Sequence, residues 1–171
     1  MMLLQEIRAK QALEEINRVD KIIINHPTPW TMIGDKKYTL VFPKYMFDYE
    51  SEKTIDILFI GKITPKRHKF LELFPNATII HSERGRDIKT KVKDVEYFNE
   101  MSKSKFTLCP NGDFVWTYRF FESIIFKSIP IIEEFCDIYD GYNYYTHNDE
   151  FIYRTDWVED NLNKLKREMT L

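Results

Sequence analysis

The sequence predicts an α/β fold, a Rossmann-like parallel sheet with helices on both faces. Two observations lead to this prediction: short, uniformly apolar runs rich in β-branched residues recur along the chain, and helical segments alternate with them. Uniformly apolar strands are typical of a sheet covered on both faces, and the alternation favours parallel strand order. The chain has 171 residues, of which 43% are hydrophobic, so a domain with a proper core is expected.

The N-terminal part of the chain is expected to be a smaller unit, with a domain division at 1–54 and 55–171. It is predicted to contain a helix and two short strands, at 3–18, 21–25 and 38–42. The two prolines of "HPTPW" (26–30) exclude both helix and strand there. The polar segment 48–54 is the expected linker.

From Ile55 onward, strands and helices alternate regularly. Strands are predicted at 55–61, 76–82, 105–110 and 129–134. Helices are predicted at 65–74, 94–104, 117–126 and 155–169. Pro65 suits the first turn of its helix, because the amide proton that proline lacks is unused there. The last helix carries acids early and bases late, as the helix dipole favours.

Charge and composition exclude several classes of protein. The formal net charge of −2 argues against a general nucleic-acid binder. No signal peptide and no apolar run of transmembrane length is visible, so a soluble cytoplasmic protein without a membrane span is predicted. The two cysteines, Cys109 and Cys136, form neither a disulfide framework nor a metal site, and Cys109 is interpreted as a free, buried thiol.

The residues that follow the predicted strands are the candidate site residues. In sheets of this kind, ligands bind outside the carboxyl ends of the strands, where the strand order reverses. After the four strands, in order, come Gly61, Lys62, Lys66 and Arg67; His81, Ser82, Glu83 and Arg84; Asn111, Gly112, Asp113, Tyr118, Arg119 and Glu122; and Glu133 and Glu134.

Gly61 and Lys62, together with Arg67, could form a phosphate site. Glycine lets a ligand approach the backbone, the next helix offers free N–H groups, and two cations neutralise charge. The alternative is an ordinary strand-to-helix turn with solvated basic side chains. Neither a G-x-G-x-x-G fingerprint nor a P-loop is present.

Arg119 and Glu122 are three positions apart, so they are expected on one face of their helix. The opposite, core-facing stripe is predicted to consist of Phe120, Phe121, Ile124 and Ile125. A carboxylate one turn into a helix can accept hydrogen bonds from two ribose hydroxyls, and a nearby arginine can hold a pyrophosphate through paired N–H bonds. The alternative is a surface ion pair along the helix.

The segment "SKFTLCPNGDFVWTYRFFESIIFKSIPIIEE" (104–134) resembles the donor-binding motif of exostosin-like glycosyltransferases. In that family a Ser-Lys-Phe strand leads to Cys-Pro-x-Gly-Asp, a helix with Arg-x-x-Glu, and an Ile-Pro strand. The matching residues are Ser104, Lys105, Phe106, Leu108, Cys109, Pro110, Gly112, Asp113, Arg119, Phe120, Glu122, Ile129 and Pro130. "ILFIGKITPKR" (57–67) also resembles the start of the C-terminal, donor-binding half of a GT-B glycosyltransferase, so the resemblance covers roughly 55–135.

The resemblance implies a site for a nucleotide-diphosphate sugar, with Glu122 on the ribose and Arg119 near the phosphates. His81 and Ser82 would lie by the base. Retaining GT-B enzymes often carry a second glutamate eight positions before the ribose-binding one, and Phe114 occupies that position here. An inverting reaction is therefore expected. No Asp-x-Asp motif of the metal-dependent GT-A type is present, so no metal or other cofactor is expected. The family usually has glycine where this chain has Lys127, which must accept backbone strain or end the helix differently.

The first 54 residues are too few for a full acceptor domain of a GT-B enzyme, so they are interpreted as a reduced acceptor side. The candidate catalytic bases in this part are His26, Asp35 and Asp48. Three hypotheses stay open. The chain is a glycosyltransferase acting on a carbohydrate or glycoconjugate acceptor, a nucleotide-sugar-binding module that needs a partner or has lost turnover, or an unrelated phosphate-binding α/β protein. For an enzyme with so short an N-terminal part, a homo-oligomer or dependence on a partner subunit is predicted.

Overall fold

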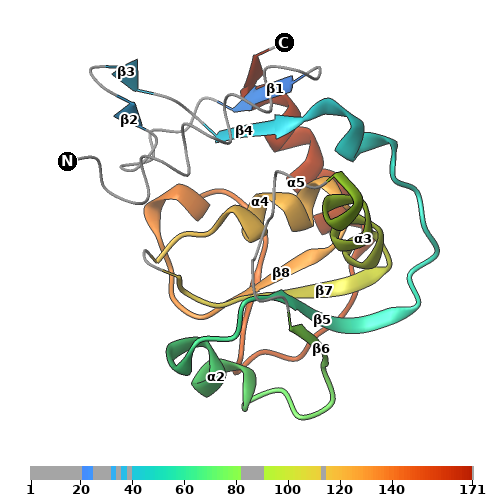
Figure 1. Cartoon of the computed structure of the whole chain (residues 1–171), viewed down its shortest axis with the longest axis vertical. Coiled ribbons are helices and arrows are strands. Elements are labelled where there is room, and N and C mark those ends of the chain that lie inside the picture. The colour runs from blue at the N-terminus through green and yellow to red at the C-terminus, as the bar shows by residue number, and fades with distance from the viewer. Residues whose placement is uncertain are drawn as a thin grey trace.

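The computed structural model describes residues 21–24, 32–33, 36–37, 40–81, 91–112 and 115–170. Its main sheet has five strands, all parallel, in the order β6-β5-β7-β8-β9 (Figure 1). The strands are β5 (Ile55–Gly61), β6 (Thr78–His81), β7 (Ser104–Cys109), β8 (Ile129–Ile132) and β9 (Tyr145–Thr146). Because β6 and β7 lie on opposite sides of β5, the strand order reverses between β5 and β7.

Helices cover both faces of this sheet, as predicted. They are α2 (Pro65–Leu71), α3 (Lys91–Ser102), α4 (Tyr118–Ile125) and α5 (Thr155–Glu168). Alternate residues of β5 point to opposite faces. Leu58 and Ile60 belong to the core formed with α3 and α4, whereas Phe59 belongs to the core formed with α2 and the start of α5. Figure 1 shows α2 on one side of the sheet and α3 and α4 on the other.

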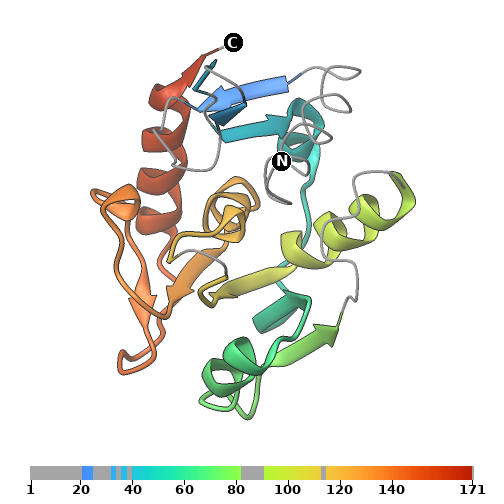
Figure 2. The ribbon, with the colours of Figure 1, turned by 60° about the vertical axis from the view of Figure 1, so that its left-hand side comes forward.

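A second, antiparallel sheet lies beyond the layer of α3 and α4 (Figure 1). Its order is β10-β1-β4, and a further strand pair, β2-β3, belongs to the same part of the chain. These strands are β1 (Lys21–Ile24), β2 (Met32–Ile33), β3 (Lys36–Lys37), β4 (Leu40–Pro43) and β10 (Met169–Thr170). Helix α5 connects the two sheets (Figure 2). The strands predicted at 21–25 and 38–42 are confirmed, and the helix predicted at 3–18 lies outside the described residues.

The short 3-10 helix η1 (Lys44–Asp48) joins the small sheet to the rest of the molecule. Phe42 and Met46, on either side of its start, are fully buried in the same core as α4. Neither η1, the second 3-10 helix η2 (Asp137–Tyr139), nor the two-residue strands β9 and β10 were predicted, because segments this short have no detectable periodicity. The domain division at residue 54 stays a prediction.

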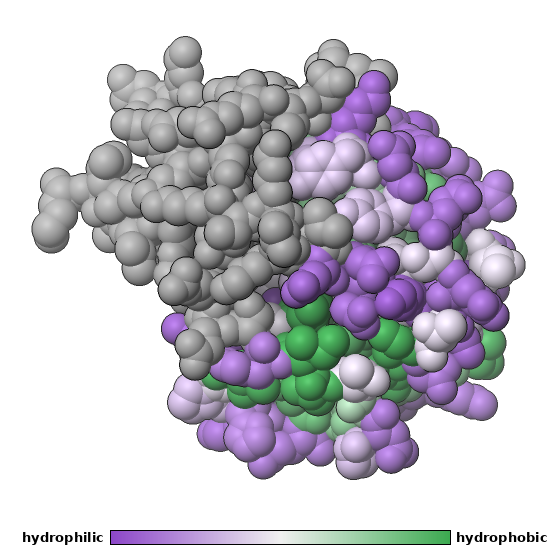
Figure 3. Space-filling view, turned by 45° about the vertical axis from the view of Figure 1, so that its right-hand side comes forward, coloured by the Kyte–Doolittle hydropathy of each residue, from purple (hydrophilic) through white to green (hydrophobic). Residues whose placement is uncertain are grey.

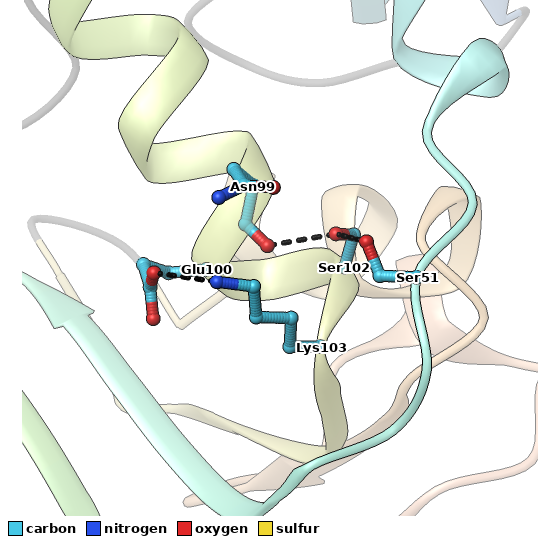
Figure 4. A network of polar contacts seen from close by, with 5 residues as sticks. All are labelled: Ser51, Asn99, Glu100, Ser102 and Lys103. Carbon is cyan, nitrogen blue, oxygen red and sulfur yellow. Dashed lines mark hydrogen bonds and ion pairs between the residues drawn. The ribbon is translucent and has the colours of Figure 1, made fainter.

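The polar segment expected as a linker is attached firmly to the helices. The Ser51 hydroxyl lies 2.8 Å from that of Ser102, at the end of α3 (Figure 4). The Lys53 ammonium donates to the Ser102 carbonyl at 2.8 Å and to the Phe126 carbonyl at 2.6 Å. Lys53 therefore caps the carboxyl ends of both α3 and α4. Burial, with a smaller contribution from the charge of Lys127, lowers the pKa of Lys53 to about 8.

Helix α4 ends in the left-handed turn for which glycine is usual. The Ser128 N–H donates to the Ser123 carbonyl at 2.8 Å and the Lys127 N–H to the Ile124 carbonyl at 3.0 Å, which is the hydrogen-bond pattern of a Schellman motif. Lys127 takes a φ of 58° there. Lys127 was expected either to accept backbone strain or to end the helix differently, and the structure shows that it accepts the strain.

Candidate functional site

The carboxyl ends of β5 and β7 bring together residues from two predicted groups. Gly61 is the last residue of β5. Strand β7 ends at Cys109, and Asn111 and Gly112 follow after Pro110. The two strands are paired in parallel, so these residues meet at one edge of the sheet, where the strand order reverses. This edge is called the β5/β7 edge below, and it is where the fold class places ligands.

The loop after β8 joins the same edge through Asn111. The Asn111 backbone N–H donates to the Glu133 carboxylate at 2.8 Å, and its side-chain amide donates to Glu134 at 3.0 Å. Asn111 is buried, yet its Oδ1 atom has no hydrogen-bond partner in the described part of the chain. A buried acceptor of this kind is costly unless a ligand or water supplies a donor.

Arg119 reaches from the start of α4 back to the end of β5. Its Nε donates to the Ile60 carbonyl at 3.2 Å, and its guanidinium lies over the Phe59 ring, 4.8 Å from the ring centroid. Gly61 has a φ of 151°, and a Cβ atom added there would clash with Nη2 of Arg119. Glycine at 61 is therefore required by both the backbone conformation and the approach of the arginine.

Arg67, in the first turn of α2 after β5, reaches in the opposite direction, toward the end of β7. Its Nη1 donates to the Lys62 carbonyl at 2.9 Å. A Cβ atom added to Gly112 would lie 2.9 Å from its Nη2. Thr64, at the N-terminus of α2, accepts a hydrogen bond from the Arg67 backbone N–H at 3.3 Å and so fixes the turn that carries the side chain. Two guanidinium groups thus lie at the β5/β7 edge.

The expectation that Arg119 and Glu122 occupy an exposed face of their helix is wrong. Every residue from Arg119 to Ile125 is buried, and Arg119 and Glu122 are only 9% and 2% exposed. The reason is that α4 lies between the main sheet and the core around Phe42 and Met46, so it has no solvent face. The alternative of a surface ion pair is therefore also excluded.

Glu122 has its own partner in a neighbouring helix. The Tyr97 hydroxyl of α3 donates to Oε2 of Glu122 at 2.6 Å, while Arg119 is bonded to the Ile60 carbonyl. The sequence analysis did not single out Tyr97, because nothing in a helical pattern indicates which side chain of another helix will be met.

Thr117, which precedes the first turn of α4, is a further polar residue that the sequence analysis missed. Its backbone N–H donates to the Tyr139 hydroxyl at 2.8 Å. Its own hydroxyl is buried, caps no backbone N–H, and has no hydrogen-bond partner among the described residues. A threonine directly before a helix is the sequence signal that could have identified it.

The remaining predicted residues are only partly placed by the structure. His81, exposed at the end of β6, accepts a hydrogen bond at Nδ1 from the Ile63 N–H at 3.4 Å, and Lys62 is exposed. Tyr118 packs against the Phe42 ring, with centroids 5.4 Å apart. Lys66 is exposed in the first turn of α2, and Asp48 is exposed at the end of η1. The remaining predicted residues lie outside the described residues: His26, Asp35, Ser82, Glu83, Arg84 and Asp113.

Cys109, at the end of β7, is a free, buried thiol as predicted. Burial raises its pKa to about 12. A thiol with so high a pKa stays protonated at neutral pH and is a poor nucleophile. Cys109 is therefore part of the core under the β5/β7 edge and no candidate for covalent chemistry.

The fold and the β5/β7 edge define the chain as a Rossmann-like α/β protein with two arginines at the edge where its strand order reverses. The family model of the exostosin GT47 domain matches residues 32–157, which include this edge. The chain therefore belongs to the exostosin GT47 family of glycosyltransferases. A comparison with curated proteins finds no match. In the part of the chain that the structure describes, no helix combines the length and apolar character that crossing a membrane requires.

Proposed function

We propose that the chain binds a nucleoside diphosphate sugar at the β5/β7 edge and transfers the sugar to a carbohydrate or glycoconjugate acceptor. The observation that carries this proposal is Arg119, a buried guanidinium beside Gly61 at the reversal of strand order. None of the ion pairs between described residues involves Arg119. A buried cation is costly until an anion compensates it, and a diphosphate group supplies that anion.

The geometry of the arginine suits a diphosphate. The bond from Nε to the Ile60 carbonyl fixes the plane of the guanidinium, and the Nη groups carry its remaining donors. Arg67 adds a second charge from the opposite side of the edge, and the backbone at Gly61 and Gly112 lets a ligand approach closely.

Glu122 supports a nucleotide rather than an inorganic anion. It follows Arg119 by three positions in α4, so the same helix carries an acceptor carboxylate and a cation. In the proposed complex Glu122 accepts hydrogen bonds from the ribose hydroxyls, and Arg119 and Arg67 hold the phosphates. His81 and Ser82 approach the base, and Lys62, Asn111, Gly112, Asp113 and Tyr118 belong to the same donor side.

The proposed reaction proceeds with inversion and without a metal ion or other cofactor. Two arginines at the edge can supply the positive charge that a leaving diphosphate needs. Phe114 in place of a second glutamate supports inversion. The catalytic base is proposed to come from the N-terminal part, with His26 and Asp35 as the first residues to substitute, because a base must reach the acceptor hydroxyl.

A calorimetric titration with UDP and GDP tests the donor site. Arg119→Ala is expected to weaken binding by about 1.5 to 3 kcal/mol, the range for a hydrogen bond to a charged group. Arg119→Lys is expected to be nearly as weak, because lysine lacks the planar fork. Arg154→Ala is the matched control, since Arg154 pairs with Asp156 at 2.8 Å on the surface. Unchanged affinity in Arg119→Ala would rule out the site.

Turnover separates a transferase from a module that only binds. Release of UDP or GDP from a sugar donor in the presence of acceptor is expected from an active enzyme. Tight binding without release would favour the alternative, a nucleotide-sugar-binding module that depends on a partner subunit. Sedimentation of the purified protein tests the proposed homo-oligomer, and fractionation of cells tests the proposed cytoplasmic location.

A further inference from the structure

Tyr97 holds the carboxylate of Glu122 from a neighbouring helix. The two residues are 25 positions apart, and the tyrosine hydroxyl donates to Oε2 at 2.6 Å. This length is typical of a strong hydrogen bond from a hydroxyl to a charged carboxylate. Glu122 is only 2% exposed, so a protein donor at this oxygen replaces a donor that water would otherwise supply.

The position of the Tyr97 hydroxyl is fixed by packing. The ring is half-buried against the core on the α4 side of the sheet, and it meets the Phe98 ring with centroids 5.7 Å apart at an angle of 69°. A tyrosine has only two side-chain torsions, so a packed ring places its hydroxyl at one point. Helix α3 therefore sets the orientation of a carboxylate that belongs to α4.

Orientation matters for a carboxylate that must meet two hydroxyls. The last torsion of glutamate is broad, so a free carboxylate rotates easily. One directed hydrogen bond at Oε2 stops this rotation and leaves the other lone-pair positions at defined points. Ribose hydroxyls are donors that need acceptors at such points, and a sugar without its 2′-hydroxyl cannot use one of them.

We propose that Tyr97 is a positioning residue for nucleotide recognition. By orienting Glu122, it makes the site favour ribonucleoside diphosphates over their 2′-deoxy counterparts. This inference rests on the proposed function, since it takes Glu122 as the residue that meets the ribose. It goes further by naming the residue that makes the protein prefer ribose to 2′-deoxyribose in the nucleotide.

The test is calorimetry of Tyr97→Phe with UDP and 2′-deoxy-UDP, and with GDP and 2′-deoxy-GDP. The wild-type protein is expected to prefer the ribonucleotide roughly tenfold, the value of one good hydrogen bond. Tyr97→Phe is expected to reduce this preference to about twofold or less, by losing affinity for the ribonucleotide and little for the deoxynucleotide. In Glu122→Ala the preference is expected to be lost completely, so that the two ligands bind with equal affinity.

The chain offers a matched control in Tyr142, whose hydroxyl donates to Oε2 of Glu168 at 2.6 Å, away from the β5/β7 edge. Tyr142→Phe removes a bond of the same kind and length, and the nucleotide preference is expected to stay at the wild-type value. A thermal melt of each variant confirms that it is folded before the titration.

Four results would overturn the inference. Equal losses of affinity for both ligands in Tyr97→Phe would show a merely structural role, and unchanged affinity for both ligands would show that Glu122 needs no positioning. A wild-type protein that binds UDP or GDP without preferring it to the deoxy form would remove the inference and leave the proposed function standing. Binding of neither nucleotide would instead remove the proposed function and the inference together.

Discussion

The segments β7–α4–β8 and β5–α2–β6 follow the same strand–helix–strand plan but differ in burial. Helix α4 is buried from Arg119 to Ile125, whereas α2 buries only Phe70 and Leu71. All four residues of β8 are buried, whereas three of the four residues of β6 are exposed. Strands β7 and β8 each have two neighbours, and β6 is an edge strand. Figure 3 shows apolar side chains reaching the surface toward the end of the molecule that carries α2 and β6 in Figure 1.

This difference determines how each segment can hold a functional side chain. Arg119 and Glu122 are fixed by a buried carbonyl, an aromatic face and a tyrosine from another helix. Arg67 lies in the first turn of an exposed helix, and its Nη1 donates to the carbonyl of the exposed Lys62. We therefore expect the buried segment to set the geometry of the site, and substitutions there to cost the most.

The largest difference in the loss of stability is expected between alanine substitutions of two isoleucines, one in each segment. Ile131 in β8 is 0% exposed and Ile79 in β6 is 39% exposed. Ile131→Ala is expected to lower the free energy of unfolding by about 2 to 5 kcal/mol, because it leaves a cavity in the core. Ile79→Ala is expected to cost less than about 1 kcal/mol. Chemical denaturation measures both, and similar values would contradict the comparison.

The two glycines of the β5/β7 edge provide the next comparison. Gly61→Ala is expected to cost about 1 to 3 kcal/mol in stability, because alanine strains a positive φ. It should also weaken nucleotide binding, since its Cβ displaces Arg119. Gly112→Ala meets only the flexible end of Arg67, so a loss within about 0.5 kcal/mol is expected. Denaturation and calorimetry on both variants test this, and equal losses would contradict it.

Lys53 connects the buried segment to the chain before β5 and makes stability depend on pH. Burial lowers its pKa from 10.5 to about 8, so between these values the unfolded chain holds a proton that the folded chain has released. Stability should therefore rise with pH across this window, by on the order of 1 kcal/mol between pH 7 and pH 9. A neutral amine keeps two N–H donors for the two carbonyls it caps.

Lys53→Met is the control for this pH dependence, because it has no proton to release. The quantity to compare is the change in unfolding free energy from pH 7 to pH 9 in each protein. Equal changes in the wild type and the variant would show that Lys53 titrates in the folded state as it does in the unfolded chain.

The smallest effect is expected at the end of α4, where Lys127 has a φ of 58°. Lys127→Gly removes the strain of a side chain in the left-handed region and should stabilise the protein by about 0.5 to 1 kcal/mol. The backbone carbonyl of residue 127, which accepts from the Tyr153 hydroxyl at 2.8 Å, is retained in the variant. A lower midpoint of thermal unfolding would contradict this prediction.

The sequence was sufficient for the elements that have a strong pattern. The strands β5, β7 and β8 are rich in apolar residues, and Pro65 marks the start of a helix, so the fold class and the β5/β7 edge could be predicted. The burial of Arg119 and Glu122 could not, because a helical pattern assumes one solvent face. That face is covered by Phe42 and Met46, which are far away in the sequence.

The contacts that individual side chains make with distant segments could not be predicted either. Arg119 meets the Ile60 carbonyl 59 positions away, and Tyr97 meets Glu122 25 positions away. Spacing within one segment carries no information on such contacts, because they depend on how two segments pack. The motif indicated the candidate residues, and the fold determines how they are held.

The two arginines of the proposed anion site can lie as they do only if β5 and β7 pair in the correct register. Arg67 follows β5 but lies beside Gly112 after β7, and Arg119 follows β7 but lies beside Gly61. Pairing of Leu58 with Thr107 aligns both contacts at once. A slip of one residue between β5 and β7 would separate both pairs and turn their side chains to the wrong faces. In the proposed complex, a diphosphate ligand would therefore stabilise only correctly registered chains, and its binding would act as a selection for the native pairing.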